Sequence, residues 1–297
     1  MHVTGGLALI TTSAAPRIGP LILGSTGRIG QAMARVWDQT PWPEGQTGLW
    51  HHRPGRTAPR QPSLAWDMLH ADPPPLPPGL TGIIVLTGGT GSDIAALEDG
   101  AALALRAFAL AASYGVRVLI ASSQAVYGRQ NGPVSEDTPC HPEGAYAKAK
   151  SIMEQEVAGR EGVTCLRIGN VAGCDTLLLT AARGPVVLDR FASGAVPLRS
   201  YIGPLTLARV LRDLLSHPGP LPAVLNVAQP GVLGMDTLLK AAGQPFTHRP
   251  APPDALARLE LDTSQLGALV SLPPAHAGEL IAEARAAGWR GHADPAA

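Results

Sequence analysis

The sequence predicts an α/β protein in which a doubly wound parallel sheet is followed by a smaller carboxy-terminal lobe. Short apolar segments alternate with helical patterns from residue 18 onward. A glycine-rich turn joins the first apolar segment to the first helix. Residues 83–86 are entirely apolar, which is typical of a strand covered on both faces. Parallel strands joined by right-handed crossovers follow from this alternation.

The pattern also places the individual elements. Strands are expected at residues 21–23, 47–50, 63–66, 83–86, 116–121 and 163–168, and helices at 28–38, 94–114 and 146–158. Ile29, Met33 and Val36 fall on one face of the first helix, and Gly115 ends the second as a C-cap. Beyond residue 169 we expect prolines, short helices, one further strand at 223–227 and a final helix within 273–288.

Composition excludes several classes of protein. The 23 Lys and Arg balance 23 Asp and Glu, so the chain is neither a basic nucleic-acid binder nor an acidic tail. No stretch approaches the roughly 18 uninterrupted apolar residues of a membrane helix. The three cysteines, Cys140, Cys165 and Cys174, are too scattered for a disulfide framework or a metal site. We therefore expect a cytoplasmic protein with no metal, nucleic-acid or membrane partner.

Residues 24–30 read GSTGRIG and lie between the first strand and the first helix. Gly24 allows the tight turn, Gly27 lets a pyrophosphate approach the backbone, and Gly30 lets the helix pack closely on the strand. The N–H groups at the helix start and the positive end of its dipole then hold phosphate. The segment predicts a dinucleotide site whose cofactor contacts are listed here: Gly24, Ser25, Thr26, Gly27, Arg28, Ile29 and Gly30.

The end of the second strand bears on the choice between NAD and NADP. An acidic side chain there would bind the ribose 2′-hydroxyl, but this chain has His51, His52 and Arg53 instead. We expect His51 and Arg53 to contact the cofactor, with Arg28 assisting, so NADP is favoured over NAD. The alternative is a solvated basic loop. Asp67, after the third strand, is placed for the adenine amino group or is a plain surface side chain.

Tyr146 and Lys150 are the candidate catalytic pair. Their spacing of four residues puts them on one face of a helix. A nearby ammonium favours the phenolate and lowers the pKa of a tyrosine toward neutrality. Lys150 is also placed to contact the nicotinamide ribose. Ser123 follows the fifth strand, at the sheet edge where ligands bind, and is suited to hydrogen-bond a substrate oxygen.

Five segments together resemble the extended short-chain dehydrogenase/reductases, the family of NAD(P)-dependent sugar epimerases and dehydratases. They read GSTGRIG, SSQAVYG, EDTPCHPEGAYAKAK, LRIGNVAG and RSYIGPLTLA, and their order and spacing are specific. The resemblance implies a Rossmann fold, Tyr146 as general acid/base, Lys150 as its partner and Ser123 as the residue that bonds the substrate carbonyl. It also implies a homodimer formed through residues 95–114 and 146–160.

The same resemblance assigns a substrate site. Asn170 would face a nucleotide-sugar, Arg199 would pair with its diphosphate, and Gln124 would contact the substrate beside Ser123. Asn170 as a turn cap and Arg199 in a surface ion pair are the alternatives. Thr87 and Gly88, where the family has other residues, are expected beneath the cofactor.

Two departures narrow the chemistry. Sugar 4,6-dehydratases carry an Asp-Glu pair where this chain has Gln124 and Ala125, neither of which exchanges protons, so dehydration is disfavoured. The family's His-Val-x-Asp is replaced by residues 203–206, Gly-Pro-Leu-Thr, which weakens the case for a nucleotide-sugar.

The sequence therefore predicts three regions: an extension at 1–17, a dinucleotide-binding domain at 18–168 to which 205–228 return, and a substrate lobe at 169–297. The predicted function is hydride transfer at a secondary alcohol or ketone of a sugar or nucleotide-sugar. The alternatives are an NADPH-dependent carbonyl reductase of a non-nucleotide substrate and a non-catalytic dinucleotide sensor.

Overall fold

The computed structural model describes residues 18–43, 46–88 and 94–292. The extension predicted at 1–17 lies outside the described residues, as do Gly89 and Gly91, which follow Gly88 in the sequence. None of the helices in the described part of the chain is both long and apolar enough to cross a membrane.

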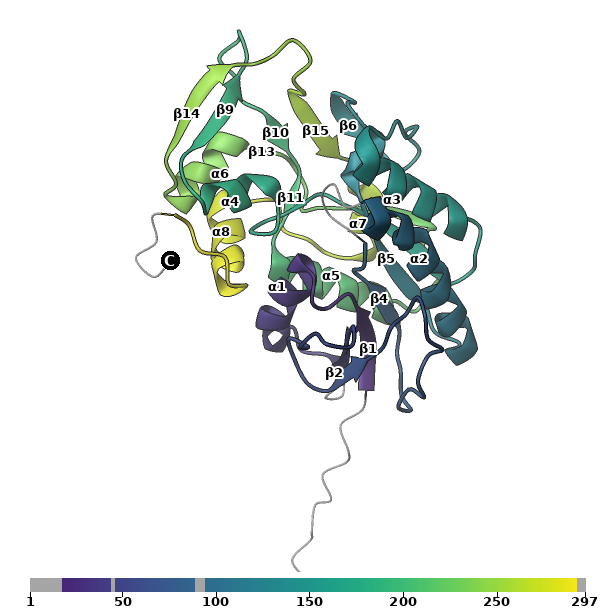
Figure 1. The fold of residues 1–297 in the computed structure, drawn as a ribbon. Coiled ribbons are helices and arrows are strands. Elements are labelled where there is room, and N and C mark those ends of the chain that lie inside the picture. The colour runs from purple at the N-terminus through teal and green to yellow at the C-terminus, as the bar shows by residue number, and fades with distance from the viewer. Residues whose placement is uncertain (1–17, 44–45, 89–93, 293–297) are drawn as a thin grey trace, which may run out of the picture.

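Seven parallel strands form the central sheet, which confirms the predicted fold class (Figure 1). In spatial order the strands are β12 (Val224–Val227), β7 (Val163–Ile168), β5 (Val118–Ser123), β4 (Ile83–Val85), β1 (Ile18–Leu23), β2 (Thr47–His52) and β3 (Ser63–Ala65). Chain order reverses between β1 and β4. This reversal opens a crevice at the carboxyl ends of the strands, where ligands of such sheets bind.

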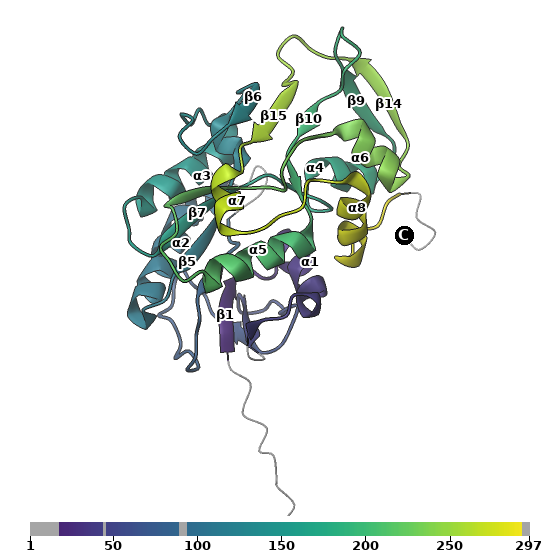
Figure 2. The ribbon, with the colours of Figure 1, turned by 180° about the vertical axis from the view of Figure 1, so that it is seen from behind.

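Helices cover both faces of the sheet (Figures 1 and 2). α1 (Arg28–Val36) and α5 (Pro204–Ser216) pack together on one face, and α2 (Ile94–Tyr114) and α3 (Gly144–Val157) pack together on the other. A 3₁₀ turn, Trp37–Gln39, follows α1, and another, Gln124–Tyr127, follows β5. The crossovers therefore build a three-layer domain.

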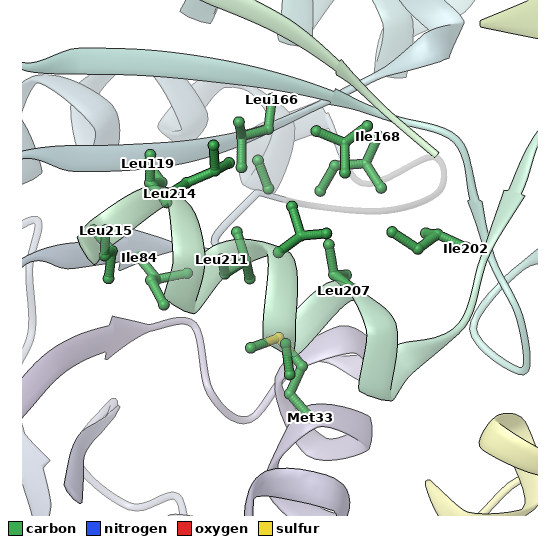
Figure 3. Packing of buried hydrophobic residues seen from close by; sticks show 14 of the residues in the cluster. Met33, Ile84, Leu119, Leu166, Ile168, Ile202, Leu207, Leu211, Leu214 and Leu215 are labelled. Carbon is green, nitrogen blue, oxygen red and sulfur yellow. The ribbon is translucent and has the colours of Figure 1, made fainter. Parts of the chain in front are cut away.

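The apolar side of α5 explains why this helix returns to the first domain. Leu207, Leu211 and Leu214 recur at helical spacing, are fully buried and point at the apolar sheet (Figure 3). Each buried leucine contributes about 1.5–3 kcal/mol of hydrophobic stabilisation. β12 follows α5 and pairs with β7, so residues within 204–227 extend the sheet. The exact division into a dinucleotide domain and a substrate lobe stays a prediction.

The second lobe has its own apolar core, around Leu178, Tyr201, Leu239 and Ile281. Its helices are α4 (Thr176–Ala181), α6 (Met235–Ala242) and α8 (Ala277–Ala286). α7 (Ser264–Leu269) packs instead against β12, and its Leu266 joins the core of the first domain. The strands of the second lobe, with β6 of the preceding loop, form three small sheets. The first contains, in spatial order, β13 (Leu233–Gly234), β10 (Leu198–Arg199), β15 (Arg258–Leu261) and β6 (Gly132–Val134). The second pairs β11 (Tyr201–Ile202) with β8 (Asn170–Val171), and the third pairs β14 (Phe246–Pro250) with β9 (Val186–Arg190).

Several predicted boundaries need correction. β2 continues two residues past its predicted end and includes His51 and His52, and β5 runs on to Ser123. The sequence predicted one strand after residue 169, whereas the structure has several additional strands of two to five residues. Such short pairings carry too few residues for an alternating pattern to be visible.

Candidate active site

A cleft of about 660 Å³ lies at the carboxyl ends of β1, β4, β5 and β7. Its walls come from both lobes, and its lining includes Thr26 to Ile29, Gly88, Ser122 to Gln124, Tyr146, Ile168 to Val171 and Cys174 to Thr176. Residues that are far apart in the sequence thus meet at the switch point of the sheet. The cleft brings together the predicted glycine loop, Ser123, Gln124, Tyr146 and Asn170.

The glycine loop between β1 and α1 is shaped by its close contacts. Gly24 has a φ of +78°, and a Cβ there would lie 2.8 Å from the backbone of Leu86. At Gly30, the Cβ would lie 2.5 Å from the carbonyl oxygen of Ser25. Both positions therefore require glycine. The first N–H groups of α1 have no partner within the helix, and Gly27 to Ile29 line the cleft, so the loop can hold an anionic phosphate.

His51 supports the glycine loop through hydrogen bonds. Its side chain is buried because β2 continues through it, and its Nε2 lies 2.8 Å from the carbonyl oxygen of Trp66. The backbone N–H of Gly24 donates to Nδ1 at 3.5 Å, and Ser25 Oγ donates to the His51 carbonyl oxygen at 2.6 Å. Burial lowers the pKa of His51, so the neutral ring is the stable form. In this structure His51 supports the glycine loop, and a direct contact with the cofactor stays a prediction.

Arg53 and Arg56 extend the cleft beyond the glycine loop. Together with Thr26, Gly27 and Thr57 they line a hollow of about 370 Å³ past the end of β2. Within the described residues neither guanidinium has a hydrogen bond or an ion pair, so their donors face solvent. Asp67 stands apart, because its carboxylate accepts hydrogen bonds from the Leu69 N–H and the His70 ring, and the His70 bond lowers its pKa. Its contact with adenine stays a prediction.

Lys150 is held beneath the cleft by backbone carbonyls. Its buried ammonium donates to the carbonyl oxygens of Ala121 at 2.7 Å and Thr87 at 3.3 Å. A Cβ on Gly88, whose φ is +123°, would lie 2.8 Å from Nζ, so this glycine leaves room for the lysine. Burial lowers the pKa of Lys150 to about 8. Thr87 and Gly88 therefore position Lys150, and any contact they make with a cofactor stays a prediction.

Tyr146 faces the cleft one helical turn before Lys150. Burial raises the pKa of its phenol, while a hydrogen bond with Ser123 and the charge of Arg28 lower it. We expected Lys150 to lower this pKa. In this structure the ammonium of Lys150 donates to carbonyl oxygens, and burial raises the pKa of Tyr146 by more than the other interactions lower it. Ser123 Oγ also accepts a hydrogen bond from the Ala125 N–H at 3.2 Å, which fixes the hydroxyl at the end of β5.

Beneath Tyr146 and Lys150 lies a buried ion pair that the sequence analysis did not predict. Glu154, two turns after Tyr146 on α3, binds Arg167 of β7, with Nη2 to Oε2 at 2.8 Å. The side chains are 9% and 8% exposed. Ser122 Oγ donates to the same carboxylate, and Arg167 Nη1 donates to Tyr127 Oη at 3.0 Å. The network joins α3, β5 and β7 at the floor of the cleft.

The predicted substrate contacts are only partly assembled. Asn170 lines the cleft and donates from Nδ2 to the Ser200 carbonyl oxygen at 3.3 Å. Arg199 lies on β10, outside the residues that line the cleft, and its guanidinium donates to the carbonyl oxygens of Leu198 and Leu256, each at 2.8 Å. These bonds engage part of the guanidinium, and the predicted contact of Arg199 with a diphosphate stays a prediction.

Asp175 is a cleft residue that the sequence analysis did not select. It is the N-cap of α4, and its Oδ1 accepts a hydrogen bond from the Leu178 N–H at 3.2 Å. Burial raises the pKa of this carboxyl to about 6. Beside it, the Cys174 carbonyl oxygen accepts a hydrogen bond from Arg28 Nη1 at 3.1 Å, which joins the glycine loop to the second lobe. An acidic residue just before a short apolar helix was the available signal.

Residues 84–198 match the sequence model of the NAD dependent epimerase/dehydratase family. This range includes Ser123, Tyr146, Lys150 and Asn170 and begins after the glycine loop. A search of curated protein sequences found no significant match.

Solved structures of similar fold span nearly the whole chain. MoeE5 in complex with UDP-glucuronic acid and NAD has a TM-score of 0.70 at 17% identity, covering 90% of this chain and 98% of that one. A UDP-glucose-4-epimerase from Stenotrophomonas maltophila with bound NAD and formylated UDP-arabinopyranose gives 0.72 at 16%, covering 90% and 97%. TunA, an NAD-dependent NDP-hexosamine 5,6-dehydratase, gives 0.68 at 18%, covering 94% and 100%. At these identities the likeness establishes the fold.

Proposed function

The match over residues 84–198 confirms the resemblance of this chain to the NAD-dependent epimerase/dehydratase family, and on that premise we propose that it transfers hydride at a secondary alcohol or ketone of a sugar-like substrate. One observation carries the proposal: Ser123, Tyr146 and the glycine loop line a single cleft, with Lys150 directly beneath it. The nicotinamide cofactor supplies the hydride acceptor or donor when bound. The tight glycine contacts at Gly24 and Gly30 fit a pyrophosphate at the start of α1.

Ser123, Tyr146 and Lys150 would each have a separate role in the reaction. Ser123 Oγ would hold the reacting oxygen, and Tyr146 would exchange a proton with it. Because burial raises the pKa of Tyr146, the phenol is the resting form and is ready to donate a proton to a carbonyl. The reverse, oxidation of an alcohol, needs the phenolate and should therefore accelerate as pH rises. Lys150, held by Ala121 and Thr87, would fix the nicotinamide ribose.

The Tyr146→Phe variant tests this assignment. A thermal-shift screen with NAD⁺, NADP⁺, UDP-glucose and simple ketoses first finds cofactor and substrate, because ligands of the native state raise the melting temperature. Loss of general acid/base catalysis then lowers kcat by about 10²- to 10⁴-fold while cofactor affinity is kept. Tyr114→Phe is the matched control, since Tyr114 lies on α2 and its hydroxyl only accepts a bond from the Leu76 N–H. Full activity of Tyr146→Phe would instead support a non-catalytic dinucleotide sensor.

We propose NADP(H) as the cofactor. The support is the pair of arginines, Arg53 and Arg56, that line the hollow beyond β2, where a carboxylate would select NAD. Charge-assisted bonds to a 2′-phosphate contribute about 1.5–3 kcal/mol, so replacing both arginines by alanine should weaken NADP⁺ binding by roughly 10- to 150-fold. NAD⁺ affinity should change little, and Arg209→Ala, on the exposed side of α5, is the control. Equal losses for both cofactors would contradict the assignment.

A net reductase is the second candidate function. It is favoured by the same two arginines and by the hydrogen bonds of Arg199 to backbone carbonyls, which leave fewer of its donors for a diphosphate. An epimerase returns the hydride to the opposite face and retains its cofactor, whereas a reductase exchanges it every turnover. Tightly bound NAD after purification would exclude the reductase. Gln124 and Ala125, which exchange no protons, disfavour 4,6-dehydration in either case.

The homodimer and the cytoplasmic setting stay predictions. The surface expected at a dimer interface is formed by α2 and α3, which lie side by side and expose Tyr114 and Ile152.

A further inference from the structure

Two side chains that contribute to the lining of the cleft each have one buried oxygen without a partner among the described residues. These oxygens are Gln124 Oε1 and Asp175 Oδ2, and each side chain is only 9% exposed. Gln124 follows β5, directly after the Ser123 that faces Tyr146. Asp175 follows β8 in the second lobe. Both side chains contribute to the same cleft.

An unpaired buried polar group is costly. It loses its hydrogen bonds to water, at about 1–3 kcal/mol for a neutral group and more for a charged one, so native structures leave few of them. Asp175 is the more costly of the two, because its Oδ1 bond to the Leu178 N–H satisfies only one oxygen. The raised pKa of its carboxyl reflects the same missing compensation.

The groups that face Asp175 do not neutralise it. The titratable side chains that interact with it are the Cys174 thiol and the Tyr201 phenol, and both have raised pKa values that keep them neutral. The Arg28 guanidinium, which acts on Cys174, donates to the Cys174 carbonyl oxygen. The N–H groups of Gly173, Leu177 and Leu178 stabilise the carboxylate only in part.

Both unpaired atoms are hydrogen-bond acceptors, so a ligand group that pairs with them must carry hydrogen-bond donors. We propose that Gln124 and Asp175 form a specificity subsite for a ligand group that carries hydrogen-bond donors and no negative charge, a hydroxyl or an ammonium. A carboxylate or phosphate bound at this wall of the cleft would be repelled by the negative charge of Asp175. The proposal deepens the proposed function, because the subsite shares its cleft with Tyr146.

Three probes that differ in one group test the subsite: glucosamine, glucose and glucuronate. Each is added at equal concentration to the full chain saturated with NADP⁺ or NAD⁺, whichever the screen shows to bind, at a pH near 8. Binding is measured by the shift in melting temperature. We expect stabilisation by glucosamine, less by glucose and none by glucuronate. Asp175→Asn should remove the discrimination, lowering the affinity for glucosamine by about tenfold or more.

A second readout needs no ligand. Because the folded-state pKa of Asp175 lies above its ordinary value, the buried carboxylate destabilises the fold above about pH 6. The unliganded Asp175→Asn protein should therefore exceed the wild type in melting temperature at high pH, and this gain should shrink toward pH 5. Asp137→Asn, at an exposed carboxylate that forms no hydrogen bond or ion pair with a described residue, should show neither effect.

The proposal is overturned if glucuronate stabilises the wild type as much as glucosamine, if Asp175→Asn keeps the wild-type ranking, or if no probe shifts the melting temperature. Failure of the proposed function is seen separately. If Tyr146→Phe retained full turnover while Asp175→Asn changed the ranking, the catalytic assignment would fall and the subsite would stand.

Discussion

Replacing Glu154 by glutamine tests whether the buried ion pair holds the floor of the cleft together. The carboxylate receives Arg167 Nε at 3.2 Å on each oxygen and Nη2 at 2.8 Å, and Ser122 donates to it as well. Glutamine keeps the shape of the side chain and removes the charge. The Arg167 guanidinium is then left in the interior without its counter-charge, with the amide oxygen, Tyr127 Oη and the Glu136 carbonyl oxygen as its acceptors.

The size of the effect follows from the burial of both partners. Removing one member of a buried pair costs about 3–5 kcal/mol, because an uncompensated charge stays behind. At roughly 2–4 °C per kcal/mol for a domain of this size class, the melting temperature should fall by about 6–20 °C. Since α3 carries Tyr146 and Lys150, cofactor affinity should fall with it.

Calorimetry and urea denaturation measure this change, and Lys240→Met is the control. Lys240 pairs with Asp236 at 2.7 Å, close to the 2.8 Å of the buried pair, but its side chain is 65% exposed, so its loss should cost less than about 0.5 kcal/mol. The double variant Glu154→Leu/Arg167→Met should recover most of the stability, because it leaves no charge behind. If Glu154→Gln cost no more than Lys240→Met, the argument from burial would be refuted.

Two further predictions concern the glycine loop. Gly30→Ala places a methyl group 2.5 Å from the Ser25 carbonyl oxygen, and overpacking of about 1–3 kcal/mol should weaken cofactor binding by roughly 5- to 150-fold in a fluorescence titration. Gly100→Ala, where a Cβ meets open space in α2, should leave binding unchanged. His51 has a pKa lowered by burial, so its contribution to stability is complete above about pH 6.5 and is lost as the pH falls through its folded-state value. Melting temperatures between about pH 8 and pH 5 should fall less steeply for His51→Gln than for the wild type, and equal slopes would contradict this role.

The sheet and the glycine loop could be read from the sequence because they rest on local patterns. Apolar runs such as 83–86 mark buried strands, and the spacing of Gly24, Gly27 and Gly30 has a steric cause that the close contacts now display. Strand ends were less accurate. The predicted end at Trp50 left His51 in a loop, whereas two more residues of β2 bury its ring behind the turn.

The parts that sequence reasoning missed depend on side chains meeting across elements. Glu154 and Arg167 lie on a helix and a strand, and nothing in their spacing of 13 residues shows that they face each other. Lys150 was paired with Tyr146 from helical periodicity, but the reach of its side chain to Ala121 and Thr87 depends on how α3 packs over β5. The charge balance around an active-site tyrosine is therefore a property of the packing and not of the motif.

The same distinction separates the two substrate assignments. Arg199 is selected as an anion partner from its place in a motif, yet its guanidinium donates to backbone carbonyl oxygens of residues 256–257. Asp175 and Gln124 match no charged motif, and burial without partners is what marks them. Since a neutral chain has no general basic field, an anion is recognised only where a donor is left free, and the described cleft offers such donors at the glycine loop and its neighbouring arginines. Because Gln124 and Asp175 present unpaired acceptors, the proposed subsite should favour hydroxyl and ammonium groups, while phosphates should bind at the cofactor end of the cleft.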